Sequence, residues 1–302
     1  MQYQKTIGRE IIVRRFIYII TFICIQIAFC SCEYKLKAFE FLYSEPQKIE
    51  ICRYDRLESQ YLTTSDFSAL QQMNTDYPME TRTLIEDMLK LGEVNDPEIN
   101  KIFLTFYQDS TLQTLISDAE SQYANVDDLN DQFNKAFTNL QKIYPKIVIP
   151  RIYMQIGALD QSIIIGNSTI GISIDKYLGE DYPLYRKYYP ETQRKTMNRK
   201  NIVPDAICFY LMSIHQMPNF DKRPQIERDI HLGKIMWLCN KVLEEKAFDT
   251  KFVKATEKYM RCHPKTEIAT FIQNNDFSAI IKHMLQKVET NLTQQAKITE
   301  SG

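Results

Sequence analysis

The side chains that could bind a metal are few and poorly spaced. No two of the four histidines have the spacing of the HExxH motif, which places both zinc ligands on one helix face; they are His215, His231, His263 and His283. Cys262 and His263 are adjacent and Glu267 follows, but a structural zinc site needs a full set of defined ligands. The sequence therefore predicts neither a metal site nor a cofactor.

Nucleophilic chemistry is equally unsupported. Residues 166–171 superficially resemble a nucleophile elbow, but they lack the GxSxG spacing and precede a second strand rather than a helix. A hairpin turn is the simpler interpretation. Glu180 and Asp181 fall in a solvated loop, where paired carboxylates need no catalytic explanation. We expect no enzymatic activity; the alternative is an envelope zinc-dependent peptidase or hydrolase with an unrecognised site.

Asp205 is the carboxylate with the most informative position. It follows Pro204, a residue suited to a first helical turn. A carboxylate there meets the positive end of the helix dipole. The prediction is that Asp205 caps this helix or bonds a loop from the tyrosine-rich region 182–189.

The thiol best placed for chemistry is Cys32. A basic start with Lys5, Arg9, Arg14 and Arg15 precedes an almost purely apolar run over residues 16–29. That run has about fourteen residues, whereas a membrane span needs roughly 20, so an export signal is favoured over a transmembrane anchor. Small Ser31 then precedes Cys32, as at a lipoprotein signal-peptidase site, although Phe29 replaces the usual leucine.

Lipidation would attach a diacylglycerol thioether to Cys32 at the new N-terminus; Cys30 is a poorer candidate because bulky Phe29 precedes it. The predicted organisation is a signal peptide over 1–31, a lipidated tether over 32–45, one domain over 46–290 and a polar tail over 291–302. The anchor would be in the inner or outer membrane, with the domain facing the periplasm.

Composition excludes several partners. The formal net charge of −1 argues against nucleic acid, and the eight glycines argue against phosphate-binding loops. Export would remove four basic residues and Glu10, leaving a mildly acidic chain that depends on its lipid for membrane attachment. The remaining cysteines permit disulfides in an exported protein, but the apolar helical context of two of them, Cys208 and Cys239, indicates buried thiols; the others are Cys52 and Cys262.

Hydrophobic periodicity predicts mostly helices. They cover 80–142, then the chain from Val203 onward, including a long helix over 226–245 and two or three more over 251–290. The clearest is an amphipathic helix over 126–143, in which Phe133 and Phe137 are expected to be buried.

The strand signals are fewer and shorter. Residues 48–54 alternate apolar and polar side chains, 145–150 form a short apolar segment bounded by prolines, and 162–174 suggest a hairpin with its turn around Asn167. The predicted fold class is α+β and predominantly helical, with a small antiparallel or mixed sheet packed against several helices.

Four segments resemble the gliding-motility lipoprotein B family. They are ISIDKYLGED at 172–181, followed by Tyr185, NIVPDA at 201–206, GKIMWL at 233–238 and IEICRYD at 49–55. The resemblance spans roughly residues 46–275. It implies a lipid-anchored envelope protein that supports gliding motility or the associated secretion machinery, with envelope or motility proteins as partners and no nucleic acid.

The same family resembles zincin-type metallopeptidases in layout, with a small sheet followed by an active-site helix and a helix carrying a third ligand. This chain departs from a catalytic version. The helix that would carry HExxH reads PDAIC at 204–208, and Leu232 precedes Gly233 where a glutamate ligand could stand. The resemblance therefore implies the scaffold without the peptidase chemistry.

Overall fold

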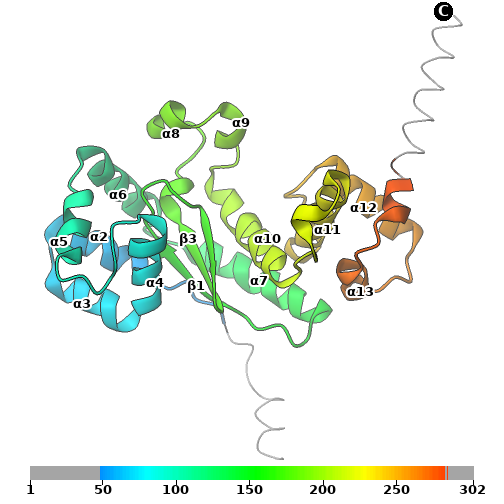
Figure 1. The fold of residues 1–302 in the computed structure, drawn as a ribbon, viewed down its shortest axis with the longest axis horizontal. Coiled ribbons are helices and arrows are strands. Elements are labelled where there is room, and N and C mark those ends of the chain that lie inside the picture. Colours follow the sequence, from blue (N-terminus) through cyan, green and yellow to red (C-terminus); the bar gives the residue numbers. More distant parts are fainter. Residues whose placement is uncertain (1–47, 283, 285–302) are drawn as a thin grey trace, which may run out of the picture. The chain divides into compact units, whose positions relative to one another are not determined.

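The computed structural model describes residues 48–282 and 284, and all of its helices and strands fall in the second of two compact units, Ile49–Gly302. The α+β prediction is confirmed: helices predominate, and a small mixed sheet interrupts them (Figure 1). None of the helices within residues 48–282 and 284 is both long and apolar enough to cross a membrane. The predicted signal peptide, the whole predicted tether and the polar tail lie outside the described residues.

The elements before the sheet are all helical. They are α2 (Tyr54–Thr64), α3 (Phe67–Asp76), α4 (Pro78–Arg82), the π-helical η1 (Thr83–Met88), α5 (Ile99–Phe106), α6 (Ser110–Gln122) and α7 (Asp127–Ile143). The predicted amphipathic helix corresponds to α7, and both Phe133 and Phe137 are fully buried as expected.

The sheet has the strand order β1-β3-β2 and is formed by β1 (Arg151–Gln155), β2 (Ile163–Gly166) and β3 (Thr169–Ser173). β2 and β3 form the predicted antiparallel hairpin around Asn167, while β1 runs parallel to β3. The predicted strand over 145–150 is wrong, because the first strand begins only at Arg151. Pro150 has no backbone N–H to give to a ladder, which is consistent with pairing that starts after it.

The predicted strand over 48–54 is also wrong, apart from one residue. Cys52 forms an isolated parallel bridge with Tyr153 of β1, and Tyr54 already begins α2. The segment that shows the apolar and polar alternation satisfies its backbone N–H groups in another way. The backbone N–H groups of Ile49 and Ile51 donate to side-chain oxygens of α7, to Asn134 at 2.7 Å and Asn130 at 2.9 Å. Side chains of a helix therefore replace the neighbouring strand that the pattern suggested.

After the sheet the chain is helical again. The elements are the 3₁₀ turn η2 (Ile174–Lys176), α8 (Pro183–Tyr188), α9 (Glu191–Arg194), η3 (Arg199–Asn201), α10 (Ile202–Ile214), η4 (Phe220–Lys222), α11 (Gln225–Leu243), α12 (Lys251–Cys262) and α13 (Ile268–Gln273). The long helix expected over 226–245 corresponds to α11. Two of the helices expected over 251–290 correspond to α12 and α13.

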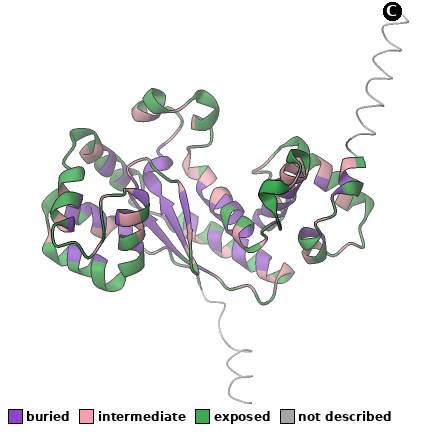
Figure 2. Cartoon of the chain, viewed as in Figure 1, coloured by how far each residue is buried: buried purple, intermediate pink, exposed green. Residues whose placement is uncertain are grey.

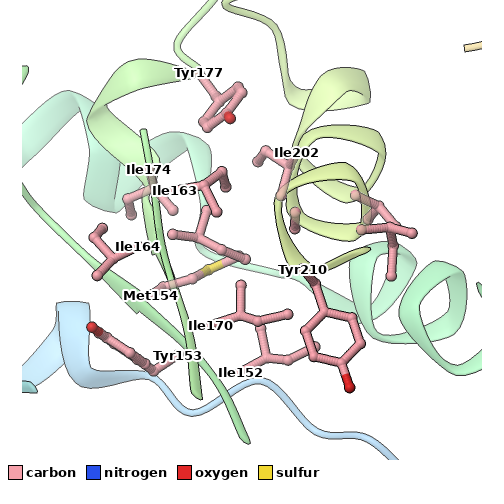
Figure 3. Close-up of a cluster of buried hydrophobic side chains, with 14 of the residues drawn as sticks. Ile152, Tyr153, Met154, Ile163, Ile164, Ile170, Ile174, Tyr177, Ile202 and Tyr210 are labelled. Atoms are coloured by element: carbon pink, nitrogen blue, oxygen red, sulfur yellow. The ribbon is translucent and has the colours of Figure 1, made fainter. Parts of the chain in front are cut away.

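One part of the hydrophobic core lies where α10 packs on the sheet. Figure 2 shows the strands as almost continuously buried, and Figure 3 shows isoleucines and Met154 of the sheet facing Ile202 and Tyr210 of α10. The hydroxyl of Tyr210 reaches past this layer and donates to the carbonyl of Val148 at 2.6 Å. The sheet and its preceding loop thus fix the position of α10, and with it Asp205.

Close packing of α11 on α12 depends on Gly233. A Cβ atom at this position would lie 2.5 Å from the Cβ of Phe252 and 2.9 Å from its carbonyl carbon. Because backbone cannot move aside cheaply, we expect Gly233→Ala to lower the free energy of unfolding by about 1–3 kcal/mol despite the better helix propensity of alanine. Chemical denaturation would measure this change in the free energy of unfolding. The control is Lys258→Ala, an exposed position on α12. Unchanged stability in Gly233→Ala would contradict the packing.

Candidate functional site

A cleft of about 360 Å³ opens beside the N-terminal end of α10. We call it the Asp205 cleft. Four segments meet there: the loop before β2, the end of η2, α9 with the residues after it, and α10. Its lining residues are Asp160, Gln161, Ser162, Ile163, Lys176, Tyr177, Gln193, Thr196, Met197, Asp205 and Phe209.

Asp205 does not cap α10. The helix begins at Ile202, so Asp205 lies within the first turn, and its Oδ2 atom accepts a hydrogen bond from the Tyr177 hydroxyl at 2.9 Å. The predicted capping bond is therefore wrong, because the helix starts earlier than expected. A bond to the aromatic region does form, but its donor precedes residues 182–189.

The chemistry of Asp205 is altered by its surroundings. Burial raises the pKa of this carboxyl from 3.8 to about 6, and the hydrogen bond from Tyr177 offsets part of that rise. Burial also raises the pKa of the Tyr177 hydroxyl well above its usual 10. Tyr177 therefore stays protonated near neutral pH and acts as a fixed donor to Asp205.

A set of tyrosine hydroxyls holds the cleft wall in place. Tyr123 donates to the carbonyl of Tyr177 at 2.7 Å, and Tyr185 donates to the carbonyl of Asp175. Tyr189 donates to the carbonyl of Leu159 at 2.8 Å. These bonds span up to 54 residues of sequence, so the turn that carries Tyr177 is anchored from several elements.

Asp175 supports the same wall from inside. It is fully buried, and its carboxylate accepts from the backbone N–H groups of Gly157 at 2.8 Å and Leu159 at 2.6 Å. Burial raises the pKa of Asp175, and these two donors oppose the rise. The carboxylate therefore fixes the loop before β2, which forms the opposite edge of the cleft.

Two of the resembling segments, 172–181 and 201–206, converge on this cleft through Tyr177 and Asp205. A third segment, 233–238, has a different role. Lys234 is buried, donates to the carbonyl of Asn274 at 2.6 Å, and lies between the rings of Phe271 and Phe277. Burial lowers the pKa of Lys234 to about 8. This lysine attaches the C-terminal helical segment to α11.

Two other hollows of the described region contain ion pairs. In the hollow lined by α11 and α12, Lys246 pairs with Asp249 at 3.0 Å. In a larger hollow near η3, Arg199 pairs with Asp128 at 2.6 Å. In the Asp205 cleft, the half-buried carboxylate of Asp205 has no ion-pair partner among the described residues.

The predicted metal candidates do not come together. Cys262 and His263 are exposed at the end of α12, where the His263 ring stacks on Tyr259. Within residues 48–282 and 284, no group of three or more histidine, cysteine, aspartate or glutamate side chains could hold a metal ion. The zincin-like layout, which is expected here without its metal ligands, is a separate prediction and is not supported by the observed fold.

The cysteines and loop carboxylates lie largely as expected. Cys208 and Cys239 are buried free thiols, and burial together with contact to Cys208 raises the pKa of Cys239. Cys52 is half-buried and free. Asp181 forms an exposed ion pair with Arg186 at 2.7 Å. Cys32 lies outside the described residues.

Sequence reasoning found Asp205 but missed Tyr177, Lys176 and Phe209 as its companions in the cleft. The tyrosine-rich composition of 175–200 was the available signal. It could not assign partners, because Asp205 stands 28 residues from Tyr177 and only the packing of α10 brings the two together.

Asp205 is expected to weaken the fold at neutral pH. Its folded pKa lies above its unfolded value, so wild-type stability is fully present below pH 3.8 and falls as the pH rises towards 6. An asparagine side chain in its place cannot ionise. We therefore expect Asp205→Asn to be more stable than wild type by about 1–2 kcal/mol at pH 7.5, after allowance for solvent screening, with the difference vanishing near pH 4.

Urea denaturation at both pH values would measure this effect. Asp131→Asn, an exposed carboxylate on α7, is the matched control and should show no such pH dependence. A variant Asp205→Asn that is less stable than wild type at pH 7.5 would contradict the assignment.

Comparison with known proteins gives a match to a family. The family model described as gliding motility protein GldB matches residues 42–263, which is more than half of the chain and includes every segment that lines the cleft. Neither a search of curated proteins nor a search of solved structures finds a match.

Proposed function

The chain belongs to the family of the gliding motility protein GldB, and we propose that it is a non-enzymatic lipoprotein, held at the cell envelope through Cys32, that supports gliding motility or the associated secretion machinery. The family match supports the role in gliding motility or the associated secretion machinery. The Ser31-Cys32 site after a basic start and a short apolar run supports the lipid anchor independently. The domain would face the periplasm from the inner or outer membrane, with envelope proteins as partners.

The Asp205 cleft is the feature of the structure that best connects the fold to this function, as a site that recognises a partner. Burial raises the pKa of the Asp205 carboxyl at a site open to ligand, and groups whose pKa is shifted in this way are concentrated at functional sites. The cleft is also within the size range of small-ligand sites. We therefore place the recognition of a partner at this cleft.

The lining of the cleft supports binding rather than catalysis. It contains no histidine or cysteine side chain. Tyr177 holds its proton too strongly to serve as a base near neutral pH. Asp205 could accept a proton, but the side chain that hydrogen-bonds it among the described residues is Tyr177 rather than a serine or threonine hydroxyl.

Deletion of the gene in its host tests the proposal. We expect reduced colony spreading or reduced delivery of surface proteins, restored by the full-length gene supplied in trans. Two readouts are needed because the family name refers to motility, whereas the associated machinery also exports proteins. Normal spreading together with normal surface delivery in the deletion strain would refute the proposed function.

A further inference from the structure

The Asp205 cleft carries uncompensated negative charge. Asp160 on its rim and Asp205 at its base form none of the ion pairs found among residues 48–282 and 284. A carboxylate withdrawn from water and left without a cation is unfavourable, and a cation supplied from outside would remove that penalty. Charge complementarity therefore favours a positively charged ligand.

The lysine in the cleft does not supply that cation. Lys176 is buried, and an ammonium has three donors. Its Nζ atom donates to the carbonyls of Leu159 at 3.0 Å and Asp160 at 3.2 Å and to the Tyr189 hydroxyl at 2.9 Å. The same ammonium also lies 4.4 Å from the centroid of the Tyr189 ring. Lys176 is thus fully engaged with the loop before β2 and with Tyr189, the residue that follows α8, and among the described residues it forms no ion pair with Asp205.

The free part of the Asp205 carboxylate favours one kind of cation. Oδ2 accepts from Tyr177, which leaves Oδ1 and the second lone pair of Oδ2 for a ligand. A guanidinium binds carboxylates best through two parallel hydrogen bonds, one of which would here share Oδ2 with the Tyr177 hydroxyl. An ammonium is a compact point charge that one oxygen can satisfy. The arrangement therefore favours an ammonium over a guanidinium.

The rest of the cleft suits an apolar stem. Ile163 and Met197 are buried in its wall, and the Phe209 side chain, one helical turn after Asp205, is 44% exposed. An alkyl chain lying against these side chains would cover the exposed Phe209 ring while its charged end reaches Asp205. Lysine has this form, with a long apolar stem and a charged tip.

We propose that the Asp205 cleft binds the side chain of a lysine presented by a partner polypeptide, with the ammonium on Asp205 and the stem along Ile163, Met197 and Phe209. This inference rests on the proposed function, in which the cleft receives an envelope partner. It adds the chemistry by which that partner is recognised.

The pH dependence of binding follows from Asp205, provided the groups that face it do not titrate in the same range. Those groups are Tyr177 from the turn after η2 and Cys239 on α11, which itself contacts Cys208, while Lys176 and Asp160 line the cleft. Burial raises the pKa of Tyr177 and of Cys239 far above neutrality. Repeating the pH series in Asp205→Asn separates the contribution of the remaining groups.

Titration of the full-length protein in detergent with N-acetyl-lysine methylamide, followed by NMR, tests the inference. Its neutral counterpart N-acetyl-norleucine methylamide keeps the stem and lacks the ammonium. We expect the lysine probe to bind, the norleucine probe to bind at least tenfold more weakly, and acidification from pH 7.5 to 5 to weaken lysine binding about tenfold as Asp205 protonates. Asp205→Asn should lose at least tenfold in affinity and most of the pH dependence, whereas Asp131→Asn should bind as wild type.

Several results would overturn the inference. They are no binding of the lysine probe, equal binding of the norleucine probe, tighter binding of N-acetyl-arginine methylamide, or full affinity in a folded Asp205→Asn protein. If that variant does not fold, the pH series on the wild type decides, and binding that does not weaken on acidification counts against the proposal. All of these measurements are independent of the deletion phenotype, so failure of the lysine site is distinguishable from failure of the proposed function.

Discussion

Cys32→Ala is expected to abolish incorporation of labelled fatty acid and to block removal of residues 1–31. The Cys32 sulfur is the atom that receives the diacylglycerol group through a thioether, and alanine has no sulfur to form that bond. Without acyl chains, the mildly acidic domain has no electrostatic attraction to an anionic membrane surface. Metabolic labelling and the mobility of the precursor on gels would measure both effects in the host.

Cys30→Ala is the matched control for this substitution, because Cys30 stands two residues earlier and bulky Phe29 precedes it. This variant should be labelled and processed like the wild type. Incorporation of fatty acid into Cys32→Ala, or its loss from Cys30→Ala, would place the lipid on another residue.

Phe137→Ala is expected to lower the free energy of unfolding by about 3–5 kcal/mol. Phe137 is fully buried on α7, and its ring lies 5.6 Å from the ring of Tyr210 on α10. Alanine would leave a cavity between α7 and α10. Equilibrium denaturation in urea, with the slope checked for two-state behaviour, would measure the loss.

Phe67→Ala provides the control for the same chemical change on the surface. The Phe67 side chain is 77% exposed at the start of α3, so its removal should alter stability by less than about 0.5 kcal/mol. Similar losses in the two variants would show that burial does not determine the stability contribution of Phe137.

Much of the helical architecture was predictable because its signals are local. The period of apolar residues in α7 identified both the helix and its buried face, including Phe133 and Phe137. The hairpin of β2 and β3 was predictable for the same reason, since its two strands and turn are contiguous in sequence. A helix or hairpin of this kind is specified by residues within one short window.

The first strand was mispredicted because its pattern has two physical explanations. Apolar side chains at Ile49 and Ile51 alternate as in a strand, and the segment is indeed extended beside β1 at Cys52. Backbone groups of Ile49 and Ile51 are satisfied by Asn134 and Asn130, polar residues on a helix about 80 residues away. No local pattern reveals that such asparagines will replace a strand.

The candidate site was only partly predictable. Asp205 stood out because a carboxylate near a helix start has a local interpretation, but that interpretation gave the wrong partner. The change in its pKa arises from burial, which depends on the packing of α10 against the sheet and on the turn that carries Tyr177. The engagement of Lys176 likewise depends on Leu159 and Tyr189 from other segments.

Anchor and cleft have separable roles in the proposed function. The lipid on Cys32 would hold the protein at the envelope, while the cleft would select what it contacts. Asp205→Asn should leave lipidation, processing and the amount of protein unchanged, and it should even stabilise the domain at neutral pH. A functional defect in this variant therefore could not be attributed to misfolding or mislocalisation.

Complementation of the deletion strain with Asp205→Asn is the most direct test of a role for the cleft in envelope machinery. The wild-type gene and Asp131→Asn, expressed at equal levels, should restore colony spreading or surface delivery. We predict that Asp205→Asn, lipidated and present in normal amount, fails to restore them. Full restoration by Asp205→Asn would contradict the assignment of function to this cleft.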